Sequence, residues 1–306
     1  MLNIAVLGGG TSSEREVSLK SSKKVFENLD ESKYIKEYFD FPSDLDKFLK
    51  DYKKFDVVMP VFHGPGGEDG TIQGFLNTLG LKFTFSDVET HAIAMNKNIT
   101  KIIMNGIGLL NPKYKMLDYK NIKKHDIEKD FGYPFVAKVN RGGSSIGVEI
   151  INNKDEFNEK IQNVIKHKQD IMIEEYIPGK EETVAILGNG NDSVAMPVTE
   201  IRPKTEFFDY KAKYDPEFCD EICPAPIEND LAKELQKQAL LVHQTLGCRG
   251  ISRSDFIVAE NNKIYFLEIN TIPGMTNASL FPQAAAVSGY DYPKFLDKLI
   301  ELALQE

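Results

Sequence analysis

The chain has 306 residues, of which 42% are hydrophobic and 27% are charged, and its formal net charge is -9. This length and composition allow one large or two to three smaller buried cores and exclude a disordered chain. The acidic balance argues against a broad basic surface for nucleic acid or for an anionic membrane, so an anionic ligand would need a few placed cations or metal ions.

Residues 3–7 predict a buried strand, residues 8–10 a turn, and Ser13-x-x-Glu16 a capping box that starts a helix. The glycines of the turn suggest a dinucleotide-binding protein, because they would let the backbone approach a pyrophosphate. That fingerprint is incomplete, since Ser13 stands where a third glycine or alanine is expected. A nicotinamide-dependent oxidoreductase stays an alternative, as does a helix end that holds another anion or positions Glu14.

The first part of the chain alternates strands with helices. After the first helix, strands are expected at 34–39 and 56–62 and a helix at about 71–79. This alternation is typical of a parallel sheet covered by helices, so the fold class is α/β. We predict that this first domain spans residues 1–95.

The rest of the chain predicts two further domains, over residues 96–178 and 179–306. The expected elements are a helix at 96–106, strands at 135–139 and 146–151, a helix at 155–166, a strand at 171–176, a strand-rich part from 179 with a polar loop at 204–223, a helix at 229–246, a hairpin and two final helices. No internal repeat or low-complexity tract interrupts this pattern.

Cysteine usage and the beginning of the sequence indicate a reducing compartment. Cys219, Cys223 and Cys248 form no CxxC pair, and their odd number favours isolated thiols over a disulfide framework. The segment MLNIAVLGGG lacks a basic n-region, and no apolar run reaches membrane length. We therefore expect a cytoplasmic protein with no membrane and no nucleic-acid partner.

The segment FVAKVNRGGSSIGVEI places Lys138 on a strand and follows it with a glycine-serine loop that leads into another strand. A Walker A loop would instead lead into a helix. Such a hairpin could close over phosphates with backbone N–H groups and serine hydroxyls, while Lys138 supplies charge. An ordinary glycine-rich hairpin with a solvated lysine is the alternative.

The segment ISRSDFIVAENNKIYFLEIN reads as a β-hairpin. With a two-residue turn at Asn261-Asn262, Asp255 faces Glu268 and Arg253 faces Asn270, and alternation puts all four on one side. The same register predicts Ile257 and Phe266 on that side, and Phe256, Val258, Tyr265 and Leu267 on the other.

Two facing carboxylates repel each other unless something positive lies between them. Magnesium prefers one or two carboxylates, an amide oxygen, water and substrate phosphates, and Asp255, Glu268 and Asn270 supply that partial set. The alternatives are a carboxyl pair that shares a proton, or a register slip that separates the two groups.

Three further segments could contribute polar groups to a site. The Pro273-Gly274 turn could offer N–H groups to an oxyanion, although a structural turn is commoner. The loop with Lys211, Lys213 and Tyr214 could bring charge and a phenol onto a substrate, or it could be a solvated loop. His63 begins HGPGGEDG just after a strand, where α/β proteins commonly bind ligands, but a lone histidine is more often structural.

Taken in order, seven segments resemble the D-alanine-D-alanine ligases: GGTSSEREVSL, HGPGGEDG, MNKNITK, VNRGGSSIG, DYKAKY, SRSD, and LEINTIPGMT with the later SLFP. They span nearly the whole chain, and the ordered set is highly specific. The resemblance implies an N-terminal parallel-sheet domain followed by central and C-terminal ATP-grasp domains. It also implies a homodimer that joins two D-alanine molecules through D-alanyl phosphate for peptidoglycan precursors, with ATP as cosubstrate and two Mg²⁺ ions that Mn²⁺ could replace.

The resemblance also assigns nucleotide and metal contacts. Lys97, Lys138 and Lys213 would contact phosphates, under a lid that carries Ser144 and Ser145. The nucleotide would be framed by Glu174, Tyr176, Ile177 and Glu181, and the metal ions would be held by Asp255, Glu268 and Asn270. Tyr176 stands where relatives often have tryptophan, which affects the finer shape of the adenine pocket.

By the same resemblance, Glu14 would bind the ammonium of the first D-alanine, and Ser144 and Tyr214 would be linked to it. His63 would lie near that substrate. The other assigned groups are Ser279 and the Leu280 backbone for the second carboxylate, and Lys213, Arg253 and the Gly274 N–H for the phosphoryl group and the oxyanion. Tyr214 favours the dipeptide enzyme over a ligase that uses D-lactate, and the full set of cations counts against a non-catalytic nucleotide-binding regulator.

Overall fold

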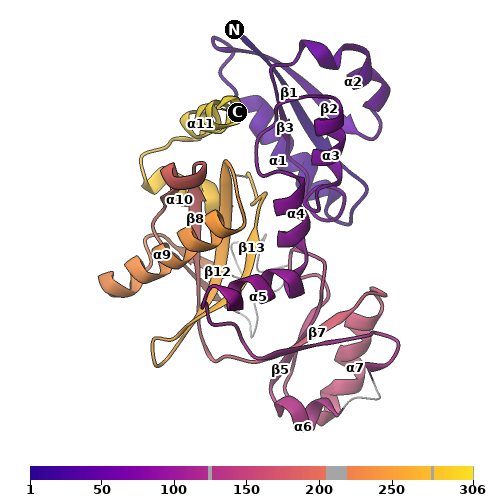
Figure 1. Cartoon of the computed structure of the whole chain (residues 1–306), viewed down its shortest axis with the longest axis vertical. Coiled ribbons are helices and arrows are strands. Elements are labelled where there is room, and N and C mark those ends of the chain that lie inside the picture. Colours follow the sequence, from indigo (N-terminus) through magenta and orange to yellow (C-terminus); the bar gives the residue numbers. More distant parts are fainter. Residues whose placement is uncertain (123–125, 205–218, 277–278, 306) are drawn as a thin grey trace.

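The computed structural model describes residues 1–122, 126–204, 219–276 and 279–305. Three sheets follow one another along the long axis of the molecule, and helices pack on each (Figure 1). The first sheet is parallel and the other two are antiparallel, so the predicted order of architectures is confirmed. The predicted domain bounds at 95/96 and 178/179 stay predictions.

The first sheet has the strand order β2-β1-β3, with β1 at Leu2–Gly9, β2 at Tyr34–Phe41 and β3 at Val57–Pro60. Residues 4–7 of β1 are fully buried, because successive side chains enter two different cores on the two faces of the sheet. The surrounding helices are α1 (Arg15–Asn28), α2 (Leu45–Asp51), η1 (Tyr52–Lys54), α3 (Thr71–Thr78) and α4 (Val88–Met95).

The predicted capping box is wrong. Helix α1 begins at Arg15, and its N-cap residue, Glu14, makes no side-chain capping bond. The serine that organises this turn is Ser12, whose hydroxyl accepts the Glu14 N–H at 3.1 Å and donates to the His63 carbonyl at 2.7 Å. The Glu14 carboxylate is thereby left to point away from the helix end.

The second sheet has the order β4-β7-β5-β6, with β4 at Tyr114–Leu117, β5 at Phe135–Val139, β6 at Val148–Ile151 and β7 at Ile171–Glu175. Helices α6 (Ile127–Phe131) and α7 (Lys154–Ile165) cover one face, where Ile127, Ile161 and Val164 enter the core. The other face carries Lys138. Helix α5 (Lys97–Gly106) leads into this region, and the Asn96 side chain caps it by accepting the Ile99 N–H.

The third sheet runs β11-β10-β8-β12-β13, and the short β9 also pairs with β8. Its strands are β8 (Gly179–Leu187), β9 (Val194–Ala195), β10 (Thr199–Pro203), β11 (Cys219–Ile222), β12 (Ile251–Ala259) and β13 (Ile264–Asn270), with η3 at Gly190–Asp192 and α9 at Asn229–Thr245. Helix α9 covers one face through Leu235, Ala239 and Val242, which recur at helical spacing. Strand β11 lies within the segment that the sequence predicted as loop.

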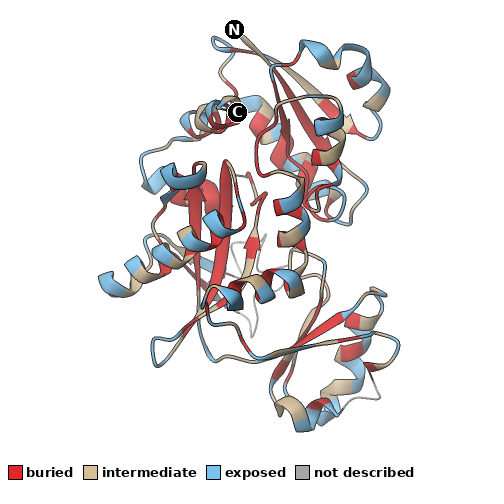
Figure 2. Ribbon diagram, viewed as in Figure 1, coloured by how far each residue is buried: buried red, intermediate tan, exposed pale blue. Residues whose placement is uncertain are grey.

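The last two helices return to the beginning of the chain. Helix α10 spans Leu280–Val287 and α11 spans Tyr292–Leu304, and α11 lies beside the first sheet near the N-terminus (Figure 1). Phe295, Leu296 and Leu299 share one buried core with Ile4 and Val6 of β1. The same core contains Ala185 and Leu187 of β8 and Ile251 of β12, so it joins the first and third sheets, whose central strands are largely buried (Figure 2).

The β12–β13 hairpin has the predicted pairing at its open end, where Arg253 faces Asn270 and Asp255 faces Glu268. Near the turn the pairing differs, because the loop has three residues (260–262) and closes with the Ala259 N–H on the Lys263 carbonyl. A β-bulge next to Asp255 shifts the register back by one residue, so the extra loop residue and the bulge compensate each other at the open end of the hairpin.

The predicted faces of three hairpin residues are wrong for the same reason. Phe266 pairs with Phe256 in the core under α9, and Tyr265 pairs with Ile257. Leu267, the extra residue of the bulge, lines a cavity on the opposite face. The catalytic candidates keep their predicted face because they lie beyond the bulge.

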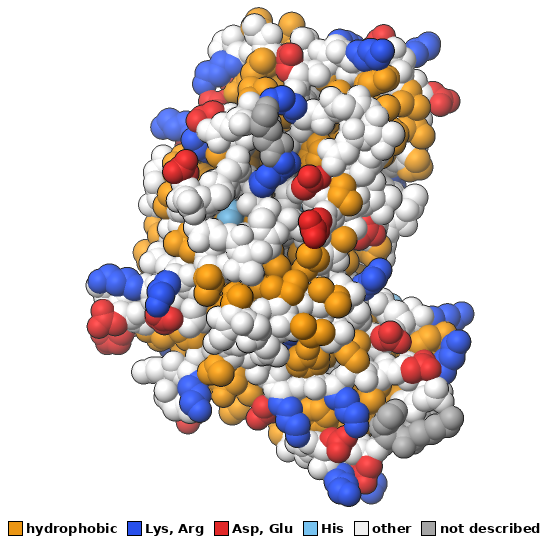
Figure 3. Space-filling model, in the orientation of Figure 1, with side chains coloured by type: hydrophobic (Ala, Val, Ile, Leu, Met, Phe, Trp, Pro, Cys, Tyr) orange, Lys and Arg blue, Asp and Glu red, His pale blue; other side chains and the backbone are white. Residues whose placement is uncertain are grey.

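The exterior has no large region of one charge on the face shown in Figure 3, where acidic and basic side chains are interspersed. Among the described residues, no helix has both the length and the apolar character to span a bilayer.

Candidate active site

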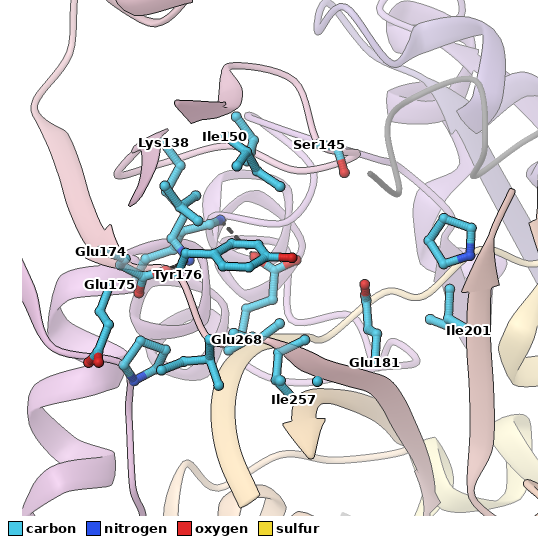
Figure 4. Close-up of a pocket in the computed structure, with 18 of the residues that line it drawn as sticks. Lys138, Ser145, Ile150, Glu174, Glu175, Tyr176, Glu181, Ile201, Ile257 and Glu268 are labelled. Atoms are coloured by element: carbon cyan, nitrogen blue, oxygen red, sulfur yellow. Dashed lines mark ion pairs between the residues drawn. The ribbon is translucent and has the colours of Figure 1, made fainter. Parts of the chain in front are cut away.

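A cavity of about 540 Å³ lies between the second and third sheets. Figure 4 shows side chains entering it from β5, β6, β7, β8, β10, β12 and β13. Eight predicted site residues line it, namely Lys97, Lys138, Ser145, Glu174, Tyr176, Ile177, Glu181 and Glu268. These predicted residues thus meet at one cavity from segments that are far apart along the chain, whereas Glu175, Lys180, Glu200 and Arg202 also line it and were not predicted.

Two apolar walls complete the cavity, and the sequence analysis did not identify them. Val136, Val148 and Ile150 come from β5 and β6, whereas Ile201 and Ile257 come from the third sheet on the other side. A flat aromatic ring between such walls would be removed from water on both faces, which is how most small-molecule sites gain affinity. Strand alternation with Lys138 could have indicated Val136 and Ile150 as neighbours on its face.

Lysines and carboxylates alternate along one side of the cavity. The Lys97 ammonium lies 3.1 Å from Glu268 Oε2 and donates to the Gly142 carbonyl at 2.7 Å. Lys138 Nζ lies 2.6 Å from Glu174 Oε2. Burial acts against the Glu174 charge, but the nearby lysines hold the pKa of that carboxyl below its usual value. Lysine side chains are thus fixed where an anionic ligand could meet them.

The proposed metal ligands lie together at the end of this side. Asp255 and Glu268 are directly opposed on β12 and β13. The buried Asn270 Oδ1 has no hydrogen-bond partner among the described residues, although buried amide oxygens ordinarily have one. An oxygen donor without a protein partner, beside two carboxylates, fits a hard divalent cation that completes its shell with water and phosphate.

Arg253 holds Asp255 in place. Its Nε donates to Asp255 Oδ1 at 2.9 Å and its Nη2 to Oδ2 at 2.8 Å, and Thr183 donates to Oδ1 at 2.6 Å. Burial opposes the charge on Arg253, but Asp255 keeps the pKa of the guanidinium above its usual value. Arg253 is therefore a permanent cation at the same place where phosphate charge would arrive.

The loop between β5 and β6 connects the cavity to Glu14. Ser145 lines the cavity, while its neighbour Ser144 donates to Glu14 Oε2 at 2.5 Å. Both serines have positive φ, at 51° for Ser144 and 56° for Ser145, a backbone strain that is found most often at functional sites. This loop thus brings the buried Glu14 carboxylate, at the start of α1, close to the cavity between the second and third sheets.

A second loop, HGPGGEDG, closes on the same carboxylate. A Cβ on Gly64 would lie 2.8 Å from Glu14 Oε1, so only glycine fits there without displacement. His63 is buried, its Nε2 lies 3.0 Å from Ser21 Oγ, and burial lowers its pKa to about 4. His63 is therefore a neutral residue that packs beside the site.

Glu68 is a residue of this loop that the sequence analysis did not single out. Its Oε2 accepts the Gly64 N–H at 2.6 Å. Burial, and then the neighbouring charge of Glu14, raise its pKa well above the usual value. The sequence feature that could have identified Glu68 is its place within the HGPGGEDG motif.

The predicted second-substrate groups also lie together. A Cβ on Gly274 would lie 2.6 Å from Ser279 Oγ, so the turn and the start of α10 are in close contact. Ser279 Oγ accepts the Thr276 N–H at 3.1 Å, and Leu280 is buried in the first turn of α10. The positive end of that helix is suited to a carboxylate.

The loop predicted to bring charge and a phenol onto the substrate is not part of the described structure: Lys213 and Tyr214, like Lys211, lie outside the described residues.

The glycines that suggested dinucleotide binding are explained by packing. A Cβ on Gly8 would overlap Ser22 Oγ at 1.9 Å, and one on Gly9 would lie 2.4 Å from the Arg15–Asp40 ion pair. The nicotinamide alternative is not favoured.

Comparison with known proteins gives one consistent result. Residues 40–86 match the family described as D-ala D-ala ligase N-terminus, and residues 103–301 match D-ala D-ala ligase C-terminus. The whole chain is 44% identical to a D-alanine-D-alanine ligase of Syntrophobacter fumaroxidans and covers 98% of it.

Solved structures agree with this match. An ATP-complexed D-alanine-D-alanine ligase from Bacillus anthracis has a TM-score of 0.86 at 32% identity, with 100% of this chain and 98% of that one covered. The VanG D-Ala:D-Ser ligase from Enterococcus faecalis has a TM-score of 0.85 at 30% identity, with 99% of each chain covered. The predicted ATP-grasp architecture is confirmed, and the chain belongs to the D-alanine-D-alanine ligase family.

Proposed function

We propose that this enzyme joins two D-alanine molecules into D-alanyl-D-alanine, with ATP converted to ADP and phosphate, for the synthesis of peptidoglycan precursors. One observation carries the proposal: a single loop supplies Ser145 to the nucleotide-sized cavity and Ser144 to the buried Glu14 carboxylate. A site for an ammonium group therefore adjoins a site for a nucleotide. We further propose that it acts in the cytoplasm as a homodimer.

The first step needs positive charge around the phosphates. ATP would lie with its adenine between the apolar walls and its phosphates toward Lys97 and Lys138. An oxygen of the first D-alanine carboxylate attacks the γ-phosphorus, the bond to the β-phosphate oxygen breaks, and ADP and D-alanyl phosphate form. Arg253 and the lysines stabilise the equatorial oxygens during transfer.

Two magnesium ions, or manganese in their place, would be held by Asp255, Glu268 and Asn270. When bound, they neutralise phosphate charge and orient the phosphoryl group. Asn270 Oδ1 has no hydrogen-bond partner in the described part of the chain, which supports this assignment, while Asp255 would have to share its oxygens with Arg253 and Thr183.

The second step forms the peptide bond. Glu14 would hold the ammonium of the first D-alanine, and Ser279 with the Leu280 N–H would hold the carboxylate of the second. The neutral amine of the second D-alanine attacks the acyl carbon, the Gly274 N–H stabilises the oxyanion, and phosphate leaves as the amine loses a proton. Lys213 and Tyr214 keep their expected roles as proposals only.

Product analysis tests this function. Purified enzyme with ATP, magnesium and D-alanine should yield D-alanyl-D-alanine by mass spectrometry, with ADP released only when D-alanine is present. Parallel reactions in which D-lactate or D-serine competes as the second substrate should give mainly the D-alanine dipeptide. An absence of D-alanine-dependent ADP release, or a depsipeptide as the main product, would overturn the assignment.

A substitution locates the first-substrate site. Glu14→Gln should raise the KM for the first D-alanine about tenfold or more, because a charge-assisted hydrogen bond to the ammonium is lost. Glu16→Gln, an exposed position two residues later, serves as the control and should leave that KM unchanged.

A further inference from the structure

Lys101 is a buried lysine that the mechanism above does not use. It lies on α5 one turn after Lys97, and its side chain has no exposure to solvent. Its ammonium lies 2.8 Å from Glu174 Oε1 and donates to the Phe266 carbonyl at 3.3 Å. A charged lysine is almost never fully buried unless it has a partner, so the Glu174 contact must offset a large desolvation cost.

Glu174 is shared by two lysines. Lys101 approaches Oε1 at 2.8 Å, and Lys138 approaches Oε2 at 2.6 Å. Burial lowers the pKa of Lys101 to about 8, and Glu174 opposes this effect. One carboxylate between two ammonium groups leaves one positive charge in excess, and of the two lysines only Lys138 lines the cavity.

We propose that Lys101 is a positioning residue for nucleotide binding: it neutralises Glu174, so that the charge of Lys138 is left for the phosphates of ATP. The inference rests on the proposed phosphate contact of Lys138. Without Lys101, Lys138 would be the main counter-charge of a buried carboxylate, and a phosphate would have to compete with Glu174 for it. Because buried ion pairs are costly to break, that competition would weaken the phosphate contact.

A purely structural role is the competing explanation. Lys101 touches β7 through Glu174 and β13 through the Phe266 carbonyl, so it also joins the second and third sheets. Loss of such a connection would disturb the whole cavity, including the adenine end. Loss of charge balance would disturb the phosphate end alone, and ligands with and without phosphates can separate the two.

The test is calorimetric binding of a non-hydrolysable ATP analogue with magnesium, compared with binding of adenosine. In Lys101→Met the analogue should bind about tenfold or more weakly, while adenosine affinity stays within about twofold. Lys115→Met is the matched control: Lys115 lies on β4, which adjoins β7, and its loss removes only a surface ion pair with Asp130 of α6, so both affinities should be unchanged. An equal loss for both ligands, or no loss, overturns the inference.

A second-site variant supplies the stricter test. Adding Glu174→Gln to Lys101→Met removes the carboxylate that competes with phosphate for Lys138, so the ratio of analogue affinity to adenosine affinity should recover by about threefold or more relative to Lys101→Met. A direct contact between Glu174 and adenine would change both affinities equally, so its effect cancels in the ratio. A further fall in the ratio overturns the charge-balance inference. If Lys101→Met does not fold, the ratio in the double variant must stay within about threefold of the unaltered enzyme.

Lys138→Met separates this inference from the proposed function. If Lys138→Met weakens the analogue but Lys101→Met does not, only the role of Lys101 is wrong. If Lys138→Met leaves analogue affinity unchanged, the phosphate contact itself is wrong, and the inference about Lys101 falls with it. Neither result bears on whether D-alanyl-D-alanine is formed.

Discussion

Two pairs of carboxylates face each other across neighbouring strands of the third sheet, and the pairs differ in what surrounds them. Asp255 and Glu268, on β12 and β13, belong to the face that carries the cavity. Arg253 bonds Asp255, and Lys97 lies 3.1 Å from Glu268. Each acid of this pair thus has its own cation.

The second pair, Glu182 and Glu200, lies on β8 and β10, and Glu182 alternates with the cavity-lining Glu181, so its side chain faces away from the cavity. Arg202 and Lys180 both contact Glu200, whereas neither oxygen of the buried Glu182 has a hydrogen-bond partner among the described residues. Burial, and then Glu200, raise the pKa of Glu182 to about 7. In the first pair each acid is thus balanced by its own cation, whereas in the second pair the cations contact Glu200 and burial favours the protonated form of Glu182. The first pair is therefore better suited to bind a metal ion.

The largest expected effect is at the cavity pair. Asp255→Asn or Glu268→Gln should lower turnover about tenfold or more and change its magnesium dependence, because a charged metal ligand is lost while the side-chain shape is kept. Glu260→Gln, in the exposed loop of the same hairpin, is the control. Unchanged rates and magnesium titrations in both variants would remove the proposed metal site and, with it, the contrast between the two pairs.

The second pair should affect stability rather than turnover. Folding raises the pKa of Glu182 from 4.5 to about 7, so the unfolded chain releases this proton first and stability falls as the pH rises between these values. Glu182→Gln imitates the protonated acid and should raise the free energy of unfolding at pH 8 by about 1–2 kcal/mol, after allowance for screening by Arg202 and Lys180. Urea unfolding at pH 5 and pH 8 measures this. An equal effect at both pH values would mean that Glu182 is not protonated in the native state.

A smaller effect tests whether burial neutralises bases as it does acids. Burial lowers the pKa of His243, on the buried side of α9, from 6.5 to about 4. The unfolded chain therefore binds this proton first as the pH falls, and stability is lost between pH 6.5 and about 4. His243→Asn should make the free energy of unfolding less dependent on pH in this range, by about 1 kcal/mol per pH unit. His167→Asn, at a partly exposed position, should change that slope less; equal changes would contradict the role of burial.

The hairpin shows how far sequence reasoning reached. It predicted the facing pairs of Asp255 with Glu268 and Arg253 with Asn270, which the structure confirms. It could not predict the three-residue loop or the bulge, because both depend on how Phe266 packs under α9 and not on local turn preference. The correct pairing therefore came with wrong faces for Tyr265, Phe266 and Leu267.

The candidate site shows the same limit. The residue pattern indicated Lys138 and Glu268, because charged residues beside a glycine-rich loop or facing each other in a hairpin are informative by themselves, whereas Lys97 and Glu174 were assigned only by the family resemblance. Lys101 gave no such signal, since a lysine on a helix is usually solvated, and only the tertiary fold brings it to Glu174. The apolar walls were missed for a similar reason, because a valine facing a cavity looks like a valine facing the core.

The position of α11 has a consequence for how the protein is made. Ile4 and Val6 lie in a core that also contains Phe295, Leu296 and Leu299, almost three hundred residues later in the chain. During synthesis β1 leaves the ribosome long before that helix exists, so one side of the first sheet stays exposed to water until α11 has been made. The folding of β1 is therefore completed late relative to its synthesis.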